Sequence, residues 1–362
     1  MSLSALLSLT AASALANPAA PEPLEFHRKF QVGERASYEV QATLNAESRR
    51  LGTDTWMPED LDIRYRFSYE VLRMLADGIA VIRYKRPSIT ETQGETFERG
   101  PVSRTIDLNM DLEIQISPIN ELLQIRDLSP KPPERPPQPS GSGLSRWSSN
   151  PILATLGVGQ QRNPLTDLLG QFVGEIYRLS LFVGSLDSSL DFAPRLSFEE
   201  VRPGDSWRRT VGYSPQKLSG RNDRMAVQRL DYTFTYKGVV RSNDADVHRV
   251  QATLDHKTDL ADFVHSTFGV KSEQTGLRTI PMEFKATIDY DLDLRTHRTL
   301  RAVGNTQGGF SVVVNQFPNQ PIEEERFKGR AVLRQVNWSV GPRAPAPPPA
   351  RQAQPAPPGR RR

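Results

Sequence analysis

Two rows of aspartates are the side chains in this sequence with the clearest capacity for chemistry. They belong to a short motif that occurs twice, as T-I-D-L-N-M-D-L at residues 105–112 and as T-I-D-Y-D-L-D-L at residues 287–294. Successive side chains of a strand point to opposite faces, so Asp289, Asp291 and Asp293 would stand about 7 Å apart along one face. Such a row could bind calcium, or it could supply the acid and the nucleophile for glycoside cleavage.

The solvated outer face of an antiparallel sheet would show the same row of carboxylates. We favour this interpretation, because neither copy of the motif contains the turn glycine or the clustered oxygen ligands of a dedicated calcium loop. A cleft would form only if the two motif strands paired and brought Asp107 or Asp111 beside the second row. The sequence therefore predicts no metal site, and Asp289, Asp291 and Asp293 are the candidates if one exists.

The opposite face of each motif strand is apolar. The side chains expected in the core are Ile106, Leu108, Met110, Leu112, Ile288, Tyr290, Leu292 and Leu294. Those expected to face outward are Asp107, Asn109, Asp111, Glu113, Asp289, Asp291, Asp293 and Arg295. Each copy is therefore predicted to be a half-buried strand of an antiparallel sheet.

A second polar constellation has the form D-H-x-x-D-x-x-D-x-x-H. It consists of Asp255, His256, Asp259, Asp262 and His265. This spacing matches no recognised site for zinc or another transition metal. We therefore predict a solvated polar loop at this position.

Other catalytic motifs are missing from the sequence. The chain has no cysteine, which excludes disulfides, thiolate metal sites and thiol nucleophiles. It also contains no G-x-S-x-G turn, P-loop, dinucleotide glycine fingerprint or H-E-x-x-H helix. We therefore predict no catalytic residue and no cofactor.

The composition is that of a globular protein with a sizeable core. Of the 362 residues, 37% are hydrophobic and 24% are charged. The formal charge of +4 reflects five arginines in the last twenty residues. Because the excess charge belongs to a tail, no nucleic-acid partner is predicted. Residues 341–362, rich in Pro, Ala and Arg, are expected to be disordered.

The N-terminal residues have the pattern of a processing signal. A short apolar run ends in Ala14-Leu15-Ala16, which has the small-x-small form of a signal peptidase site. We predict that residues 1–16 form a signal peptide and that the protein is exported to the periplasm or the extracellular space. No later stretch reaches the about 20 apolar residues that a transmembrane helix needs.

The body of the chain is predicted to be mainly β and to consist of two related halves, residues 17–128 and 185–340. Each half starts with a glycine–acidic pair, at Gly33 and at Gly204, continues through a hairpin and reaches its copy of the aspartate motif. An internal duplication explains this order. A chance likeness between alternating strands is the alternative.

Residues 129–162 join the halves as a Pro-, Gly- and Ser-rich linker. Residues 163–184 then predict an amphipathic helix, with Asn163 as its cap and Pro164 at its first position. We expect this helix to pack on the open end or the concave face of the sheet. Gly308 and Gly309 predict a loop between two short strands.

The glycine–acidic turns V-G-E-R and P-G-D-S-W, the long hairpins and the I-D-Y-D-L-D strand resemble uncharacterised exported bacterial envelope proteins of the domain-of-unknown-function type. The pattern is more distantly similar to half-barrel carriers of the lipoprotein-localisation type. The resemblance spans residues 26–340. It implies a curved antiparallel sheet or half-barrel that cups an acyl chain under a helix, and it assigns no site residue. The lipobox cysteine of lipoproteins is missing.

Two classes of function follow from these patterns. The first is a non-catalytic cell-envelope protein that binds an apolar ligand or lipid, or contacts an envelope polymer through its arginine-rich tail. The second is a glycosidase-like hydrolase or calcium-binding protein that uses the outward carboxylates. Carboxylates that meet in a cleft would support the second class, whereas carboxylates on an open surface would exclude it.

Overall fold

The computed structural model describes residues 22–94, 100–129, 176, 177, 179, 181, 194–213, 228–268, 273 and 276–341. The predicted signal peptide lies outside these residues, as do nearly all of the predicted linker, most of the predicted helix at 163–184 and nearly all of the predicted tail. Four residues of that helix are described and buried, of which Ile176, Tyr177 and Leu179 are helical and Leu181 lies in a turn.

The described chain is mainly β, as predicted. The first half contains β1 (Glu34–Arg50), β2 (Met57–Pro58), β3 (Leu61–Met74), a short 3-10 turn η1 (Ala76–Gly78), β4 (Ala80–Gln93), β5 (Val102–Ile116) and β6 (Leu122–Asp127). The second half contains β7 (Ser206–Tyr213), β8 (Gln228–Ser242), β9 (Ala245–Asp259), α3 (Ala261–Phe268), β10 (Leu277–Thr279), β11 (Pro281–Leu292), β12 (Thr299–Val314) and β13 (Glu323–Val340).

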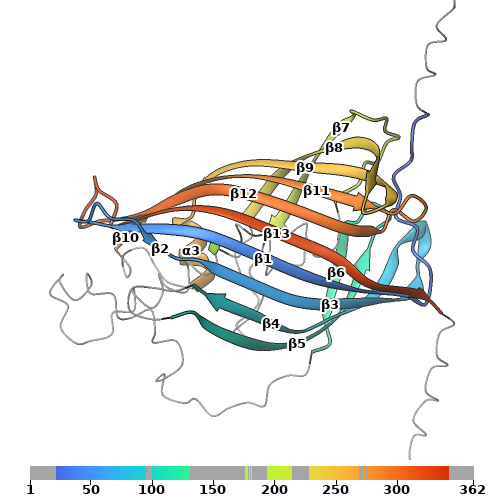
Figure 1. Ribbon diagram of the computed structural model, residues 1–362, viewed down its shortest axis with the longest axis horizontal. Helices are drawn as coiled ribbons and strands as arrows, with labels where there is room; N and C mark the ends of the chain where they lie inside the picture. The colour runs from blue at the N-terminus through green and yellow to red at the C-terminus, as the bar shows by residue number, and fades with distance from the viewer. Residues whose placement is uncertain are drawn as a thin grey trace, which may run out of the picture.

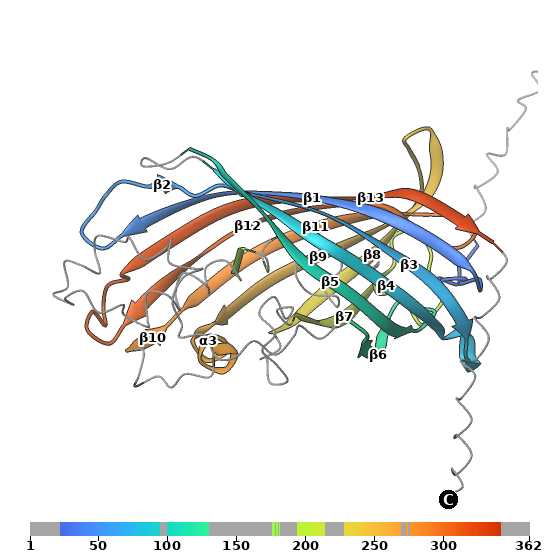
Figure 2. The same ribbon diagram turned by 90° about the horizontal axis from the view of Figure 1, so that it is seen from below.

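These strands form one curved antiparallel sheet (Figures 1 and 2). Its order is β6-β5-β4-β3-β1-β13-β12-β11-β9-β8-β7, with β2 beside β1 and β10 beside β12. The sheet is open, because β6 and β7 are not paired with each other in the described part of the chain. The prediction of an antiparallel curved sheet is confirmed.

The two halves meet where β1 pairs with β13. The register runs from Glu34 opposite Val340 to Arg50 opposite Glu323. Each half is a meander in the predicted order, so both belong to the same sheet and not to two separate sheets. The internal duplication itself stays a prediction.

Local turn chemistry explains the long hairpins. Asp77 and Gly78 both have positive φ, at 57° and 71°, and connect β3 to β4. Asn243 and Asp244, at 46° and 64°, connect β8 to β9 in the same way. Two consecutive left-handed residues give a turn whose twist matches that of the flanking strands, which is why Asp, Asn and Gly occupy these positions.

The prediction of a loop at Gly308 and Gly309 is wrong, because both glycines lie inside β12. A Cβ atom on Gly308 would lie 2.3 Å from the backbone oxygen of Glu283 on β11. A Cβ atom on Gly309 would lie 2.4 Å from the backbone oxygen of Glu325 on β13. The neighbouring strands approach so closely that only glycine fits, so the pair marks a close strand contact and not a turn.

The prediction of a polar loop at residues 255–265 is also wrong. Asp255 and His256 belong to β9, and Asp262 and His265 belong to α3. Asp259 joins the two elements, because its Oδ1 accepts hydrogen bonds from the amides of Ala261 and Ile280 at 2.9 and 2.8 Å. No helix among the described residues has the length and apolar character needed to cross a bilayer.

One end of the sheet is closed by irregular chain. Residues 24–33, which we call the strap, cross this end. Leu24 forms an antiparallel bridge with Val201, just before β7. The Arg28 amide donates to the Pro118 carbonyl, between β5 and β6, at 2.7 Å. The strap therefore links the two edge regions of the open sheet.

The two motif strands differ in burial, which gives a test of the fold. Ile288 is fully buried on β11, whereas Ile106 is only half-buried on β5. We expect Ile288→Ala to lower the free energy of unfolding by about 2–5 kcal/mol, because it removes buried methylene groups and leaves a cavity. Ile106→Ala should lower the free energy of unfolding by less, because Ile106 is only half-buried. Urea denaturation of both variants measures the difference, with Thr253→Ala on the outer face of β9 as the control. Equal losses at the two isoleucines would contradict this assignment.

Candidate binding surface

The two faces of the sheet have different chemistry. Along β1, burial alternates strictly from Glu34 to Ser48, so the even-numbered side chains share one buried face and the odd-numbered side chains face solvent. We call the buried face the inner face. Its residues form a continuous apolar layer across β3, β1, β13, β12, β11, β9 and β8. The outer face is polar.

The centre of the inner face is lined by small side chains. In one row across five neighbouring strands, four residues are small, namely Ala42, Ala331, Gly304 and Ala252, and the fifth is Ile288. In the next row, a Cβ atom on Gly329 would lie 2.8 Å from Leu181. Leu181 is itself buried, one turn beyond Tyr177. The small residues therefore admit covering side chains close to the backbone of the sheet.

Toward the β6 edge, the inner face is no longer covered. Ile125 lies opposite Ile114 of β5, which is fully buried, yet Ile125 is 48% exposed. Leu123, which shares the face of Ile125 along β6, is 50% exposed. We call these two side chains the open strip. Ile106, Leu108 and Met110 of β5, which precede the segment paired with β6, are also only half-buried. The apolar layer thus continues from the core to the surface.

A buried arginine lies beneath this part of the inner face. Arg86 on β4 is fully buried, and its guanidinium lies over the ring of Tyr65 at 4.5 Å. Its Nε donates to the Tyr84 hydroxyl at 2.8 Å. Met110 of β5 is its cross-strand neighbour. The rings and the hydroxyl hold the cation among apolar side chains, an arrangement that sequence periodicity alone did not identify.

Acidic side chains gather at the opposite end of the inner face. The Tyr177 hydroxyl donates to Glu325 at 2.5 Å and to Glu59 at 3.2 Å. Burial, and then the charges of Glu59 and Glu323, raise the pKa of Glu325 well above its ordinary value. Burial and the Glu59 charge raise the pKa of Glu323 to about 7. Tyr177 belongs to the predicted helix at residues 163–184. Its hydrogen bonds to Glu59 and Glu325 therefore attach this part of the chain to the sheet.

The aspartates singled out by sequence do not share one solvated row. Asp289 accepts a hydrogen bond from Gln251 at 2.9 Å. Asp291 is only 4% exposed, so the prediction that it faces solvent is wrong. Its two oxygens accept hydrogen bonds from Ser242 at 2.7 Å and from Arg249 at 2.8 Å. The end of the β8–β9 hairpin supplies the serine that covers it.

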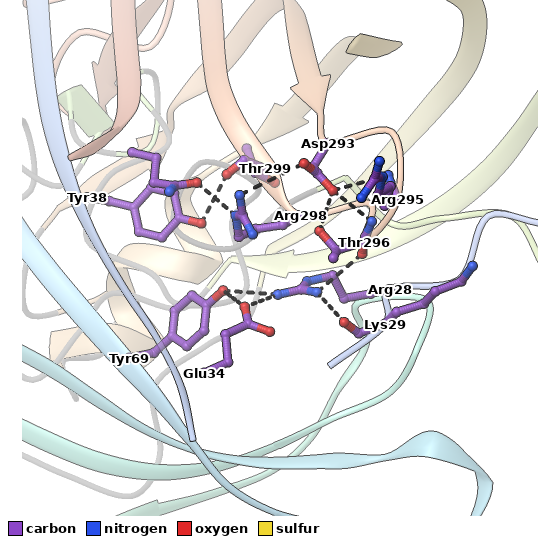
Figure 3. A network of polar contacts seen from close by, with 11 residues as sticks. Arg28, Lys29, Glu34, Tyr38, Tyr69, Asp293, Arg295, Thr296, Arg298 and Thr299 are labelled. Carbon is purple, nitrogen blue, oxygen red and sulfur yellow. Dashed lines mark hydrogen bonds and ion pairs between the residues drawn. The ribbon is translucent and has the colours of Figure 1, made fainter. Parts of the chain in front are cut away.

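Asp293 lies beyond the end of β11 and holds a turn. Its Oδ1 accepts hydrogen bonds from the amides of Arg295 and Thr296 and from the Thr296 hydroxyl, at 2.7–3.1 Å (Figure 3). Burial raises the pKa of Asp293. The hydrogen bonds from Thr296 and Arg295 and the charge of Arg298 lower it, and together they outweigh burial, so the pKa lies below its ordinary value. Leu294, which we expected in the core, is 41% exposed because it belongs to this turn.

The first motif strand lies far from the second. Five strands separate β5 from β11 in the sheet, so Asp107 and Asp111 do not lie beside the second row. Asp111 is held by Arg83 through two hydrogen bonds of 2.8 and 2.7 Å. Among the described residues, no three acidic or histidine side chains are grouped so that they could hold a metal ion. The carboxylates thus form cross-strand contacts, and no cleft unites them.

Two solved structures resemble this chain remotely. No family model matches the chain, and no curated protein matches it. A structure concerned with lipid–protein interactions in lipovitellin covers 88% of this chain at 10% identity and a TM-score of 0.41, and this chain spans 26% of that one. A DUF1329 family protein from Desulfovibrio piger covers 84% of this chain and 85% of its own at 8% identity and a TM-score of 0.14. Neither likeness is close enough to argue from, and the envelope-family resemblance stays a prediction.

The acidic end of the inner face gives a prediction about pH. The folded protein binds a proton at Glu323 more tightly than the unfolded chain does, because the pKa is raised from 4.5 to about 7. The stability from this group is therefore fully present below about pH 4.5 and is lost as the pH rises through 7. Glu323→Gln should remove this part of the dependence, as measured by urea denaturation between pH 4.5 and 8.

The matched control is Glu324→Gln. Glu324 is the next residue of β13, points to the outer face and pairs with Arg49. It should leave the pH dependence of stability unchanged. A Glu323→Gln variant that kept the pH profile of the unsubstituted protein would disprove the role of this carboxyl.

Proposed function

We propose that this protein is an exported, non-catalytic binding protein of the cell envelope that holds an apolar ligand, such as a lipid acyl chain, against the inner face of its sheet. The observation that carries the proposal is the open strip. There, the apolar layer of the inner face reaches solvent at Leu123 and Ile125. Contiguous exposed apolar side chains mark places where a protein binds an apolar partner.

The shape of the sheet supports the same function. A curved open sheet presents many apolar side chains to one side. An acyl chain needs only dispersed apolar contacts and no fixed polar constellation. The hydrolase or calcium-binding alternative has less support, because protein donors already hold its candidate carboxylates. These are Asp111, Asp289, Asp291 and Asp293.

Ligand binding can be tested at the open strip. The double variant Leu123→Asp, Ile125→Asp should weaken binding of cis-parinaric acid, a fluorescent fatty acid, by at least about tenfold, because two apolar contacts are replaced by charges. Both side chains are half-exposed, so the free energy of unfolding should change little. Fluorescence titration and urea denaturation give the two readouts.

Val239→Asp is the matched control, because Val239 is 55% exposed on β8, near the other edge of the sheet. It should bind the probe as the unsubstituted protein does. Equal binding by the double variant would refute the open strip as the site. An unsubstituted protein that neither binds the probe nor carries lipid in native mass spectrometry would refute the function.

Export is tested separately from binding. We expect residues 1–16, fused to alkaline phosphatase, to deliver active enzyme to the periplasm, because this reporter folds only where disulfides form. Replacing Ala14 and Ala16 with Asp should abolish cleavage, since the small-x-small pattern is lost. A fusion that is produced but stays inactive in the cytoplasm would contradict export.

A further inference from the structure

The strap is hydrogen-bonded to both halves of the sheet. On the first-half side, the Gly33 amide donates to the Val71 carbonyl of β3 at 2.9 Å. On the second-half side, the Lys29 amide donates to the Thr296 carbonyl at 3.0 Å. His297 Nδ1 lies 2.8 Å from the His27 carbonyl, which can only accept, so this nitrogen donates. The strap therefore holds one end of the open sheet together.

An ion pair fixes the middle of the strap. Arg28 pairs with Glu34 at the start of β1, and both side chains are buried. Tyr69 of β3 joins them, with its hydroxyl 3.2 Å from Arg28 and 2.9 Å from Glu34 (Figure 3). Glu34 is thus already committed to Arg28 and Tyr69. It is not free to neutralise a second cation.

Two histidines lie against the buried aromatic ring of the strap. Phe26 is fully buried, and its centroid lies 5.4 Å from the ring of His248 and 5.1 Å from the ring of His297. The two histidine rings are 5.4 Å apart. Tyr236 completes the cluster, with its ring 4.8 Å from Phe26 and its hydroxyl 2.8 Å from His248 Nδ1. A histidine pair is therefore packed on the residue that anchors the strap.

The charged and titratable groups around this pair come from five elements. They are Glu25, His27, Arg28 and Lys29 of the strap, Glu34 of β1, Tyr69 of β3, Tyr236 of β8, and Asp293 and Arg298 of the turn between β11 and β12. Glu25 lies 3.0 Å from His27, and Asp293 is occupied by Thr296. Arg28 and Lys29 add positive charge beside His297, whereas the Asp293 charge acts on His248 in the opposite direction, against the larger effect of burial.

We infer that the strap is an acid-sensitive latch, which opens when His248 and His297 become protonated. Two imidazolium rings at this separation would repel each other and Arg28, and both would lose the apolar contact that fits neutral rings. Release of Phe26 would free the strap from the second half of the sheet. The sheet end that it closes would then open.

The direction of the pH effect follows from the environment of the rings. Burial lowers the pKa of His248. Burial, together with the nearby positive groups, lowers the pKa of His297 from 6.5 to about 4. Groups with a lowered pKa add stability above their unfolded value and lose it as the pH falls. The strap is therefore firmly closed above about pH 6.5 and loosens progressively toward pH 4.

Hydrogen exchange of the full chain tests the latch. The amides of Arg28, Lys29 and Gly33 should lose at least about tenfold of their protection between pH 7 and pH 5, after correction for the intrinsic exchange rate. Amides in the middle of β1 should keep theirs. The double variant His248→Gln, His297→Gln cannot gain these charges, so its strap protection should stay unchanged over the same range.

His256→Gln is the matched control, because His256 is a partly buried histidine packed on Phe284 of β11, outside the cluster, and its pKa is also lowered by burial. It should retain the acid response. Equal loss of strap protection in the double variant, or loss across all strands together, would overturn the latch. Histidine ring signals followed by NMR in the unsubstituted protein add a test that needs no variant. Rings that stay neutral while the strap loosens would also overturn it.

Discussion

The pairing of β1 with β13 is the contact on which the rest of the sheet depends. Every other main pair joins strands that are neighbours along the chain, whereas this one joins the start of the first half to the end of the second. Without it, the molecule would consist of two separate meanders, each with a further exposed edge and half of the apolar layer. This contact joins residues far apart in the sequence, so forming it lowers the entropy of a long stretch of chain. Burial of the apolar inner face has to offset that loss.

Local patterns in the sequence were enough to predict the type of fold. Alternation with a period of two identified the strands, and Asp77-Gly78 identified a hairpin, because side-chain direction and turn geometry depend on neighbours in sequence. The errors arose where neighbours in space decide. Gly308 and Gly309 resemble a loop until the backbones of β11 and β13 are placed beside them. Asp291 resembles a surface residue until Ser242 covers it.

The candidate site was less predictable than the fold for the same reason. Ile106 and Ile288 occupy equivalent places in the two copies of the motif, so the sequence predicts the same burial for both. In the structure, Ile106 is half-buried and Ile288 is fully buried. The strand that carries Leu123 and Ile125 is short and lies at an edge, and its exposure depends on what packs over it. The spacing of the aspartates suggested a shared site, but donors on neighbouring strands hold Asp111, Asp289 and Asp291, and the turn after β11 holds Asp293. Polar groups instead gather at the two ends of the inner face, around Tyr177 and around Arg28.

The unpaired edges of the sheet affect what the inner face can hold. In a closed barrel, strand number and stagger fix the radius, so the interior accepts a narrow range of volumes. Here β6 and β7 are joined through the strap and its neighbouring loops rather than by a ladder of hydrogen bonds. The curvature can therefore change without breaking any strand pair. Under the proposed function, the molecule would act as a clasp of adjustable width, whose capacity follows the length and bulk of the ligand and is not set by the strand count.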